Sequence, residues 1–329
     1  MSDAHVNRRE FIAATLTGAA ALALPNLAGG AVAPPMPERA LGNTGHRVRI
    51  FSLGGQATLE KPGMQDQSVA IINRAIDLGV NYLDTAAAYG RGISQRYIGE
   101  VMRTRRREVF LASKTHDRTR EGSLRLLEQS LELLQTDHLD LWQLHNISRT
   151  EQLDTIFGRN GAIEAMAAAR DQKLVRFVGI TGHYDPDVLL DGIQRYDFDT
   201  ILMAMNPADR HFLSFQEKLL PEANRRGMGV IAMKIPARGR VFREGGLTSM
   251  KDALGYTLSQ PVSTTIVGCD TIAQLEENVR IAQQFRPLSS AELSRIEGAV
   301  AGYARDAAFF KRGATGFSMA YTTSSQNTD

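Results

Sequence analysis

The sequence predicts a (β/α)8 barrel preceded by an N-terminal signal segment. Eight short apolar or β-branched runs alternate with amphipathic stretches of helical periodicity. The short runs are mostly apolar on both faces, as expected for buried parallel strands. The 329 residues suffice for such a barrel, which takes roughly 250. Eight βα units in one chain favour a closed barrel over an open doubly wound sheet.

The N-terminal segment has the pattern of an export signal. An arginine pair in Asn7-Arg8-Arg9-Glu10-Phe11 precedes an apolar run, and Ala31-Val32-Ala33 follows at A-x-A spacing. This order predicts a twin-arginine signal peptide over residues 1–33 and a periplasmic or exported protein. The run is too short and too rich in Ala, Thr and Gly for a stable membrane span after processing. The alternative is a frayed amphipathic helix, and Pro34 leaves the cleavage position open.

The rest of the chain divides into a Pro-rich linker (34–40), the barrel with a C-terminal helix (41–310) and a polar tail (311–329). The expected strands are 48–53, 80–84, 109–113, 139–145, 175–181, 200–205, 229–234 and 264–267. The expected helices are 67–78, 94–102, 122–134, 162–171, 187–196, 214–226, 249–259, 272–285 and 290–304. Asp66, Ser94 and Asp270-Thr271 are expected N-caps, and Gly79 and Gly227 are expected to end helices.

Composition excludes several functions. A net charge of +2 is too small for a nucleic-acid partner. The single cysteine, Cys269, excludes an intramolecular disulfide or a cysteine-ligated iron–sulfur cluster, and we expect it to be a small buried residue rather than a functional thiol. No G-x-G-x-x-G follows the first strand, so a Rossmann unit is not supported. His145 and His183 alone do not predict a metal site.

Polar side chains at the carboxyl ends of the strands suggest chemistry, because barrel active sites lie at that end. Asp84 ends the second strand, Tyr89 follows it, and Lys114 and His145 end the next two. An ammonium stabilises a phenolate, a carboxylate holds the ammonium, and an imidazole orients a carbonyl or relays a proton. Each residue alone has a structural explanation, as a helix cap, a solvated cation or a core side chain. Together they predict protonation of a carbonyl oxygen.

These segments resemble the aldo-keto reductases from about residue 41 to 285. The resemblance lies in Asn81-Tyr82-Leu83-Asp84-Thr85-Ala86 with Tyr89-Gly90, in Ser113-Lys114, in Leu139-Asp140-Leu141-Trp142-Gln143-Leu144-His145, and in Ile266-Val267-Gly268 followed by Leu275-Glu276-Glu277-Asn278. It implies hydride transfer between a nicotinamide cofactor and an aldehyde, ketone or sugar-like substrate. Tyr89 would donate the proton, and His145 would orient the carbonyl. Lys114, held by Asp84, would lower the pKa of the Tyr89 hydroxyl. The implied cofactor-binding residues are Gly55, Thr181, Gly182, Asn206, Met233, Lys234, Gly268, Gln274, Glu277 and Asn278.

Three positions depart from the family pattern. Gly182 stands where the family commonly has an amide side chain, and Met233 replaces the usual aromatic residue. The Met233-Lys234 pair resembles a bacterial branch of the family. Asp270 lies where a cation often binds the 2′-phosphate of NADP. The family favours NADP, but NAD stays possible.

Two other functions compete with an exported NAD(P)-linked carbonyl reductase or alcohol dehydrogenase. Loss of the amide and of the aromatic residue also suits a cofactor-binding or regulatory barrel with little or no turnover. An enzyme with tightly held cofactor could instead oxidise and re-reduce one sugar-like substrate. The four polar residues at the strand ends favour chemistry. We therefore expect an exported NAD(P)-dependent oxidoreductase whose partners are a small carbonyl substrate and the twin-arginine export machinery.

Overall fold

The computed structural model describes residues 34–313; the predicted signal and nearly all of the predicted tail lie outside the described residues. Eight parallel strands close into a barrel in the order β10-β3-β4-β5-β6-β7-β8-β9. The predicted (β/α)8 fold is thus confirmed. The strands are β3 (Phe51–Gly54), β4 (Tyr82–Asp84), β5 (Phe110–Thr115), β6 (Leu139–Leu144), β7 (Val175–Gly182), β8 (Thr200–Ala204), β9 (Gly229–Met233) and β10 (Thr264–Val267).

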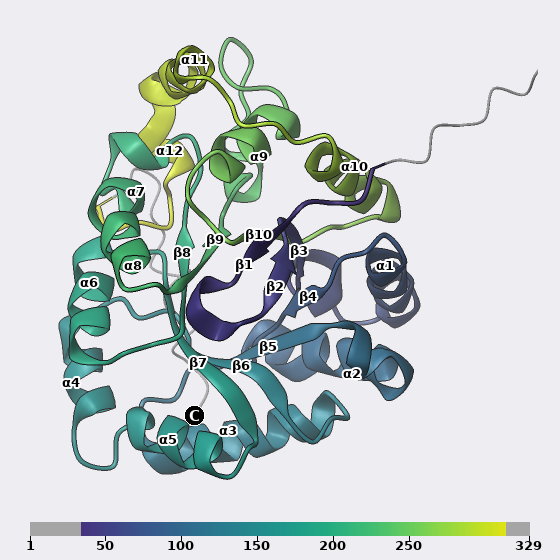
Figure 1. Cartoon of the computed structure of the whole chain (residues 1–329), viewed down its shortest axis with the longest axis vertical. Coiled ribbons are helices and arrows are strands. Elements are labelled where there is room, and N and C mark those ends of the chain that lie inside the picture. The colour runs from purple at the N-terminus through teal and green to yellow at the C-terminus, as the bar shows by residue number, and fades with distance from the viewer. Residues whose placement is uncertain (1–33, 314–329) are drawn as a thin grey trace, which may run out of the picture. The chain divides into compact units, whose positions relative to one another are not determined.

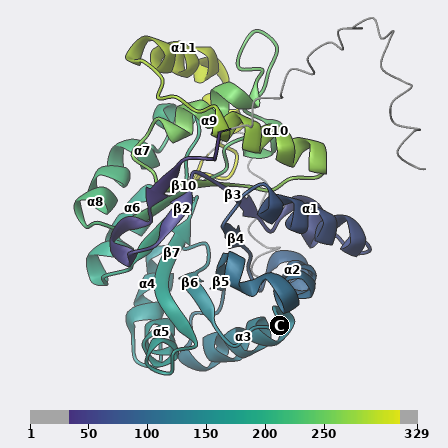
Figure 2. The same cartoon turned by 45° about the vertical axis from the view of Figure 1, so that its right-hand side comes forward.

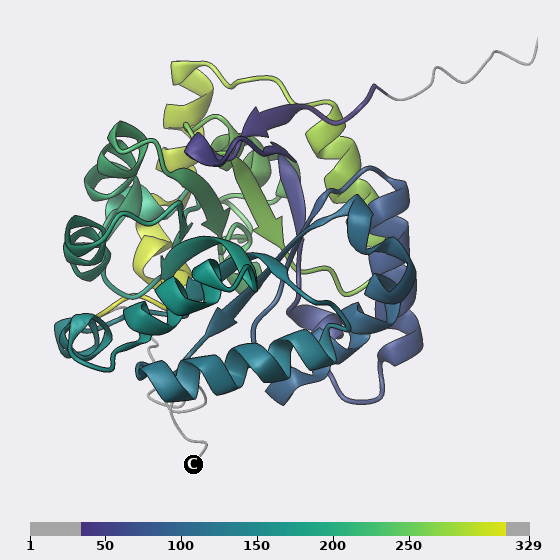
Figure 3. The same ribbon diagram turned by 60° about the horizontal axis from the view of Figure 1, so that its bottom comes forward.

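Helices surround these strands (Figure 1; Figure 3). They are α1 (Gln65–Asp77), α2 (Ile93–Arg105), α3 (Arg120–Leu133), α4 (Thr150–Phe157), α5 (Ala162–Asp171), α6 (Pro186–Arg195), α7 (Phe215–Lys218), α8 (Leu220–Arg225), α9 (Met250–Leu258), α10 (Ile272–Gln283), α11 (Ser290–Val300) and α12 (Ala304–Ala307). Helix α4 was not predicted. The helix expected over 214–226 is divided into α7 and α8, with Pro221 in the first turn of α8, because proline cannot continue the hydrogen bonding of a preceding helix.

Successive side chains along each strand point alternately into the barrel and toward the helices, which gives two hydrophobic cores. Tyr82, Phe110, Ala112, Leu141 and Leu202 belong to the cluster that fills the barrel interior. A second, larger cluster lies between the strands and the helices. Side chains two residues apart on a strand share a face, so the polar residues that continue the interior rows point to the barrel mouth.

A short antiparallel hairpin, β1 (Glu38–Ala40) with β2 (Arg47–Arg49), covers the amino ends of the barrel strands (Figure 2). The Asn43 amide donates to the Gly227 carbonyl (2.9 Å), and the Asn81 side chain accepts from the Arg49 amide (2.8 Å). The hairpin turn needs glycine at Gly42, whose φ is +54°. Residues 38–40, expected in a linker, are therefore a strand, and the expected strand 48–53 is divided into β2 and β3.

The expected helix caps were partly correct. Thr271 accepts a hydrogen bond from the Gln274 amide at the start of α10 (3.2 Å), and Gly79 and Gly227 have positive φ after helix ends. Asp66 and Ser94 lie inside the first turns of α1 and α2, so their assignment as N-caps was wrong. Ser94 instead pairs with the Thr85 hydroxyl (2.8 Å). None of the helices between residues 34 and 313 is both long and apolar enough to cross a membrane.

Candidate active site

Three neighbouring strands bring the predicted catalytic side chains together. In the parallel register Asp84 of β4 lies opposite Ala112 of β5, and Lys114 lies opposite Gln143 of β6. Lys114 and Gln143 continue the interior rows that contain Ala112 and Leu141, so both point into the barrel. His145 follows two residues after Gln143 in the same row. Its backbone amide donates to the Thr115 carbonyl (2.8 Å), which fixes the loop after β6 against β5.

Lys114 connects the other groups. Its ammonium donates to a carboxylate oxygen of Asp84, to the Thr85 carbonyl (2.8 Å) and to the Tyr89 hydroxyl (3.4 Å). Tyr89 begins the 3-10 turn η3 (Tyr89–Gly92) after β4. Its ring meets the His145 imidazole edge to face, with 5.5 Å between centroids. The predicted tetrad therefore converges at one place, with Tyr89 in contact with both the Lys114 ammonium and the His145 ring.

Burial opposes both charges of the Asp84–Lys114 pair. Desolvation raises the pKa of the Asp84 carboxyl and lowers the pKa of the Lys114 ammonium, while each charge favours the ionised form of the other. The side chains are 3% and 1% exposed, so breaking the pair would leave an uncompensated charge. Gln143 also donates to Asp84 (3.3 Å). Sequence reasoning missed Gln143, although its alternation with Leu141 and His145 on one strand face could have identified it.

His145 is held as a neutral imidazole. Burial lowers its pKa well below the usual range, and the positive charges of Lys114 and Arg118 act in the same direction. A neutral imidazole can donate one hydrogen bond to a carbonyl oxygen without adding a charge.

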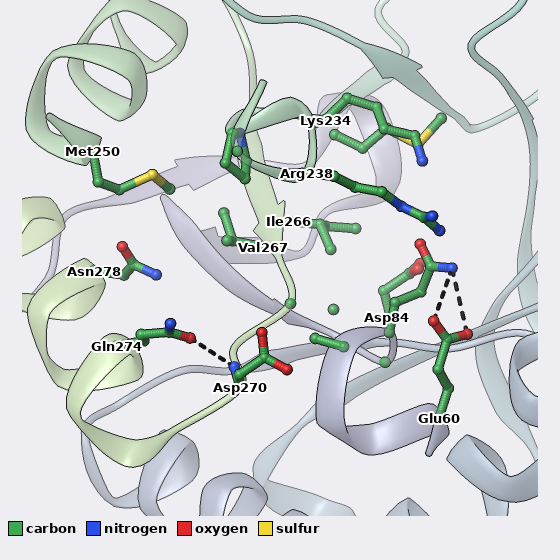
Figure 4. A pocket seen from close by; sticks show the side chains of 18 of the residues that line it. Glu60, Asp84, Lys234, Arg238, Met250, Ile266, Val267, Asp270, Gln274 and Asn278 are labelled. Atoms are coloured by element: carbon green, nitrogen blue, oxygen red, sulfur yellow. Dashed lines mark hydrogen bonds between the residues drawn. The ribbon is translucent and has the colours of Figure 1, made fainter. Parts of the chain in front are cut away.

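A cavity of about 710 Å³ extends from Asp84 and Tyr89 toward α10 (Figure 4). This volume lies within the roughly 300–1,000 Å³ of ligand pockets. Of the predicted cofactor-binding residues, those that line it are Gly55, Met233, Lys234, Gly268, Gln274, Glu277 and Asn278. Asp84 and Tyr89 of the predicted tetrad line this cavity, whereas Lys114 and His145 do not. Its volume suits a dinucleotide.

Charged side chains line the same side of this cavity as Asp84 (Figure 4). Lys234 and Arg238 project from the loop after β9, opposite Glu60 of the 3-10 turn η2 (Ala57–Glu60) (Figure 4). Burial raises the pKa of Glu60, against the opposing effects of a Gln56 hydrogen bond and the two cations. A Cβ on Gly268 would lie 3.2 Å from the Gln56 carbonyl oxygen, so the two backbone segments approach each other closely there. Two cations beside exposed backbone can hold a diphosphate.

The far end of the cavity contains a cation that the sequence did not reveal. Lys61 donates to the Asp270 carboxylate (2.9 Å), and Thr58 donates to the same oxygen (3.2 Å). The segment around Asp270 offers no local cation, but Lys61 comes from a loop 209 residues earlier and neutralises it. The neighbouring Cys269 is buried as expected, and burial raises the pKa of its thiol to about 12.

Three predicted cofactor-binding residues do not line the cavity. The Thr181 hydroxyl accepts from the Asn146 amide (2.8 Å), and Asn206 donates to the Lys234 carbonyl (2.9 Å) and accepts from the Ala208 amide (2.9 Å). A Cβ on Gly182 would lie 2.7 Å from the Ile147 carbonyl oxygen. In this structure Thr181 and Asn206 hold the strand ends in place, and Gly182 lets the Ile147 backbone approach closely.

The geometry agrees with comparisons to known proteins. Residues 51–245, more than half of the chain, match the model of the aldo/keto reductase family. The chain belongs to this family. Members of the aldo/keto reductase family use NADPH.

Relatives span most of this aldo/keto reductase. An uncharacterized oxidoreductase of Bacillus subtilis is 26% identical over 80% of this chain and 96% of its own length. The L-galactose dehydrogenase of Arabidopsis thaliana is 28% identical over 79% and 92%. The holo form of an aldo-keto reductase from Bacillus halodurans superposes with a TM-score of 0.68 at 25% identity, covering 80% of this chain and 96% of that one. An aldo-keto reductase of Klebsiella pneumoniae, solved in complex with NADPH, shares the fold at 22% identity with a TM-score of 0.67, covering 81% and 96%.

Proposed function

We propose that this protein is an NAD(P)H-dependent reductase of aldehydes, ketones or sugar-like carbonyl compounds, with Tyr89 as proton donor. The observation that carries the proposal is the Lys114 ammonium, which is hydrogen-bonded to both the buried Asp84 carboxylate and the Tyr89 hydroxyl. A structural ion pair would not need a tyrosine hydroxyl beside it at the end of a cavity.

Each residue of this group has a distinct role. Tyr89 gives its proton to the carbonyl oxygen, and Lys114 stabilises the phenolate that remains. Asp84 keeps the ammonium charged and in position despite its burial. His145, neutral because of its burial, orients the carbonyl by donating a hydrogen bond. In the reverse direction the same groups remove the hydroxyl proton of an alcohol.

The cavity residues fit a nicotinamide dinucleotide. Lys234 and Arg238 would hold the diphosphate, and Gln274, Glu277 and Asn278 would contact the adenosine end. Met233 replaces the usual aromatic residue and would pack on a flat ring through its polarizable sulfur. When bound, the nucleotide supplies or accepts the hydride.

Replacement of Tyr89 by Phe tests the proposal. Loss of a general acid typically lowers turnover by about 10²–10⁴-fold, while NADPH affinity should stay within about twofold because the cavity keeps its charges. Turnover of a panel of aldehydes is followed by NADPH oxidation, and nucleotide binding by NADPH fluorescence.

Tyr196→Phe is the matched control, since Tyr196 ends α6 and packs against Phe198. Y89F turnover equal to that of the control would exclude Tyr89 as the proton donor. Nucleotide binding without turnover of any aldehyde or ketone in the unmodified protein would support the cofactor-binding or regulatory alternative.

We also propose that the enzyme is exported by the twin-arginine route. The support is the sequence pattern around Arg8-Arg9 and Ala31-Val32-Ala33. This route carries folded proteins, which suits an enzyme that acquires a nucleotide in the cytosol.

A further inference from the structure

One corner of the barrel mouth, next to His145, holds buried polar atoms that the tetrad does not use. It is formed by the loop between β5 and α3 and by the residue after His145. Within residues 34–313 three buried atoms here have no hydrogen-bond partner: Nη1 of Arg118, Nδ1 of His116 and Oδ1 of Asn146. Buried polar atoms are nearly always hydrogen-bonded in folded proteins. These three atoms lie on residues next to one another beside His145, so one ligand could satisfy them together.

Arg118 is fixed in position. Its Nη2 donates to the His145 carbonyl (2.7 Å) and more weakly to the Asn146 carbonyl (3.4 Å). Its own carbonyl accepts from the Ala162 amide (2.8 Å), and the next residue, Thr119, forms a β-bridge with Gly161. Hydrogen bonds therefore fix both the backbone and the side chain of Arg118, and they hold its guanidinium beside the His145 imidazole. A group held in this way loses little conformational entropy when it binds a ligand.

Arg118 has no carboxylate partner among the described residues. The neighbouring Asp117 uses its carboxylate to accept from the amide and the hydroxyl of Thr119 (2.8 and 2.7 Å). Burial lowers the pKa of Arg118 to about 10, so the guanidinium still carries its charge at neutral pH. By contrast, Arg106 at the opposite end of the barrel is paired with the buried Asp140 (2.8 Å). A buried charge without a counter-ion is costly.

Apart from Asp117, the titratable groups near Arg118 add no negative charge to this corner. Asp84 offsets Lys114, burial keeps His145 uncharged, and His116 has its pKa lowered by burial and by Arg118. His183, also near His145, has a pKa well below its usual range for the same reason of burial. The neighbouring Asp117 carboxylate favours the charged form of Arg118, but within the described residues no carboxylate forms a salt bridge with this guanidinium.

We propose that Arg118 binds a carboxylate of the substrate, so that the preferred substrates are aldehydes or ketones that also carry a carboxylate group. This inference rests on the proposed carbonyl reduction and names its substrate class. His116 and Asn146 would take hydroxyl groups of the same molecule, since an imidazole nitrogen and an amide oxygen can both accept.

The test compares two substrates that differ by one charge, 4-oxobutanoate and its methyl ester. We expect the unmodified enzyme to have the higher kcat/KM with the acid. In Arg118→Met the acid-to-ester ratio of kcat/KM should fall roughly 10-fold to 100-fold, the range of a hydrogen bond to a charged group, mainly through KM. Arg118→Lys should restore part of the ratio because it restores the charge.

Arg39→Met is the matched control. Arg39 also donates to backbone carbonyls, those of Val262 and Leu258 (both 2.7 Å), but at the closed end of the barrel. Its removal should lower thermal stability without changing the acid-to-ester ratio. An unchanged ratio in folded R118M would overturn the proposal. The proposal would also be overturned if R118M kept the acid-to-ester ratio of kcat/KM but lost a preference for glyceraldehyde 3-phosphate over glyceraldehyde. In that case Arg118 would bind a phosphate and not a carboxylate.

The two proposals fail differently. Failure of carbonyl reduction would appear as no NADPH oxidation with any aldehyde or ketone, in the unmodified enzyme and the variants alike. Failure of the carboxylate assignment would appear as turnover that does not depend on the charge of the substrate or on Arg118.

Discussion

The ion pair between Lys61 and Asp270 predicts how the enzyme chooses its nucleotide. If the adenosine end of NADPH lies between Gln274 and Asn278, its 2′-phosphate meets Lys61 and Asp270, which line the same cavity. Lys61 then contributes in two ways: it attracts the phosphate, and it neutralises a carboxylate that would repel it. Replacement of Lys61 by Ala should weaken NADPH binding far more than NADH binding.

The magnitude follows from Coulomb's law and exposure. Two unit charges 4 Å apart interact by about 1 kcal/mol in water and about 4 kcal/mol at an effective dielectric constant near 20. The Lys61 and Asp270 side chains are 56% and 50% exposed, which places the effect near the lower value. A loss of roughly 1–2 kcal/mol corresponds to an increase of about 5-fold to 30-fold in the Kd of NADPH.

The assay titrates the protein with NADPH and NADH and follows the fluorescence of the nucleotide. Trp142 is not suited as a reporter, because it is buried between the strands and the helices rather than in the barrel interior. Competition by 2′,5′-ADP and 5′-AMP isolates the adenosine end. Arg74→Ala is the control, since Arg74 forms a similar half-exposed pair with Glu276 of α10 but does not line the cavity.

Equal losses of NADPH and NADH affinity in K61A would refute this reasoning, as would an unchanged Kd for NADPH. The first result would mean that Lys61 supports the fold of the cavity and does not bind the 2′-phosphate of NADPH. The second would mean that the phosphate lies elsewhere.

Two further outcomes are expected. His145 and His183 have pKa values well below the usual range in the fold, so the unfolded chain, with histidine pKa near 6.5, binds more protons as pH falls. Stability should therefore decrease from pH 7.5 to 5.5 by up to about 1.4 kcal/mol per pH unit for each histidine; urea midpoints that do not change would contradict this. Replacement of Arg8-Arg9 by two lysines should abolish export of the full chain, measured by fractionation against the unmodified signal, whereas equal export would exclude the twin-arginine route.

Local patterns account for what the sequence predicted correctly. Each barrel strand is an apolar run with a polar residue at its carboxyl end, and parallel strands in register place those ends together. Asp84, Lys114 and His145 could thus be assigned to one site from their spacing. Thr271 was predictable as a cap because capping depends on neighbouring residues alone.

The remaining features depend on contacts between distant segments. No local pattern could place Lys61 on Asp270 or show that Arg118 is held by the backbone of His145. The β1–β2 hairpin was missed because its strands are three residues long and follow a Pro-rich stretch. Thr181 and Asn206 were assigned to the cofactor by position, and their contact with it stays a prediction; no local pattern could show that their polar groups also bind the backbone of adjacent loops.

The hairpin that closes one end of the barrel has a practical consequence. Residues 34–37 lead into β1, which lies over the amino ends of the strands, while the tetrad and the cavity lie at the carboxyl ends. A support, label or carrier protein attached just before residue 36 would lie at the amino ends of the strands, opposite the tetrad. The enzyme could therefore be immobilised through that end with nucleotide and substrate still free to enter.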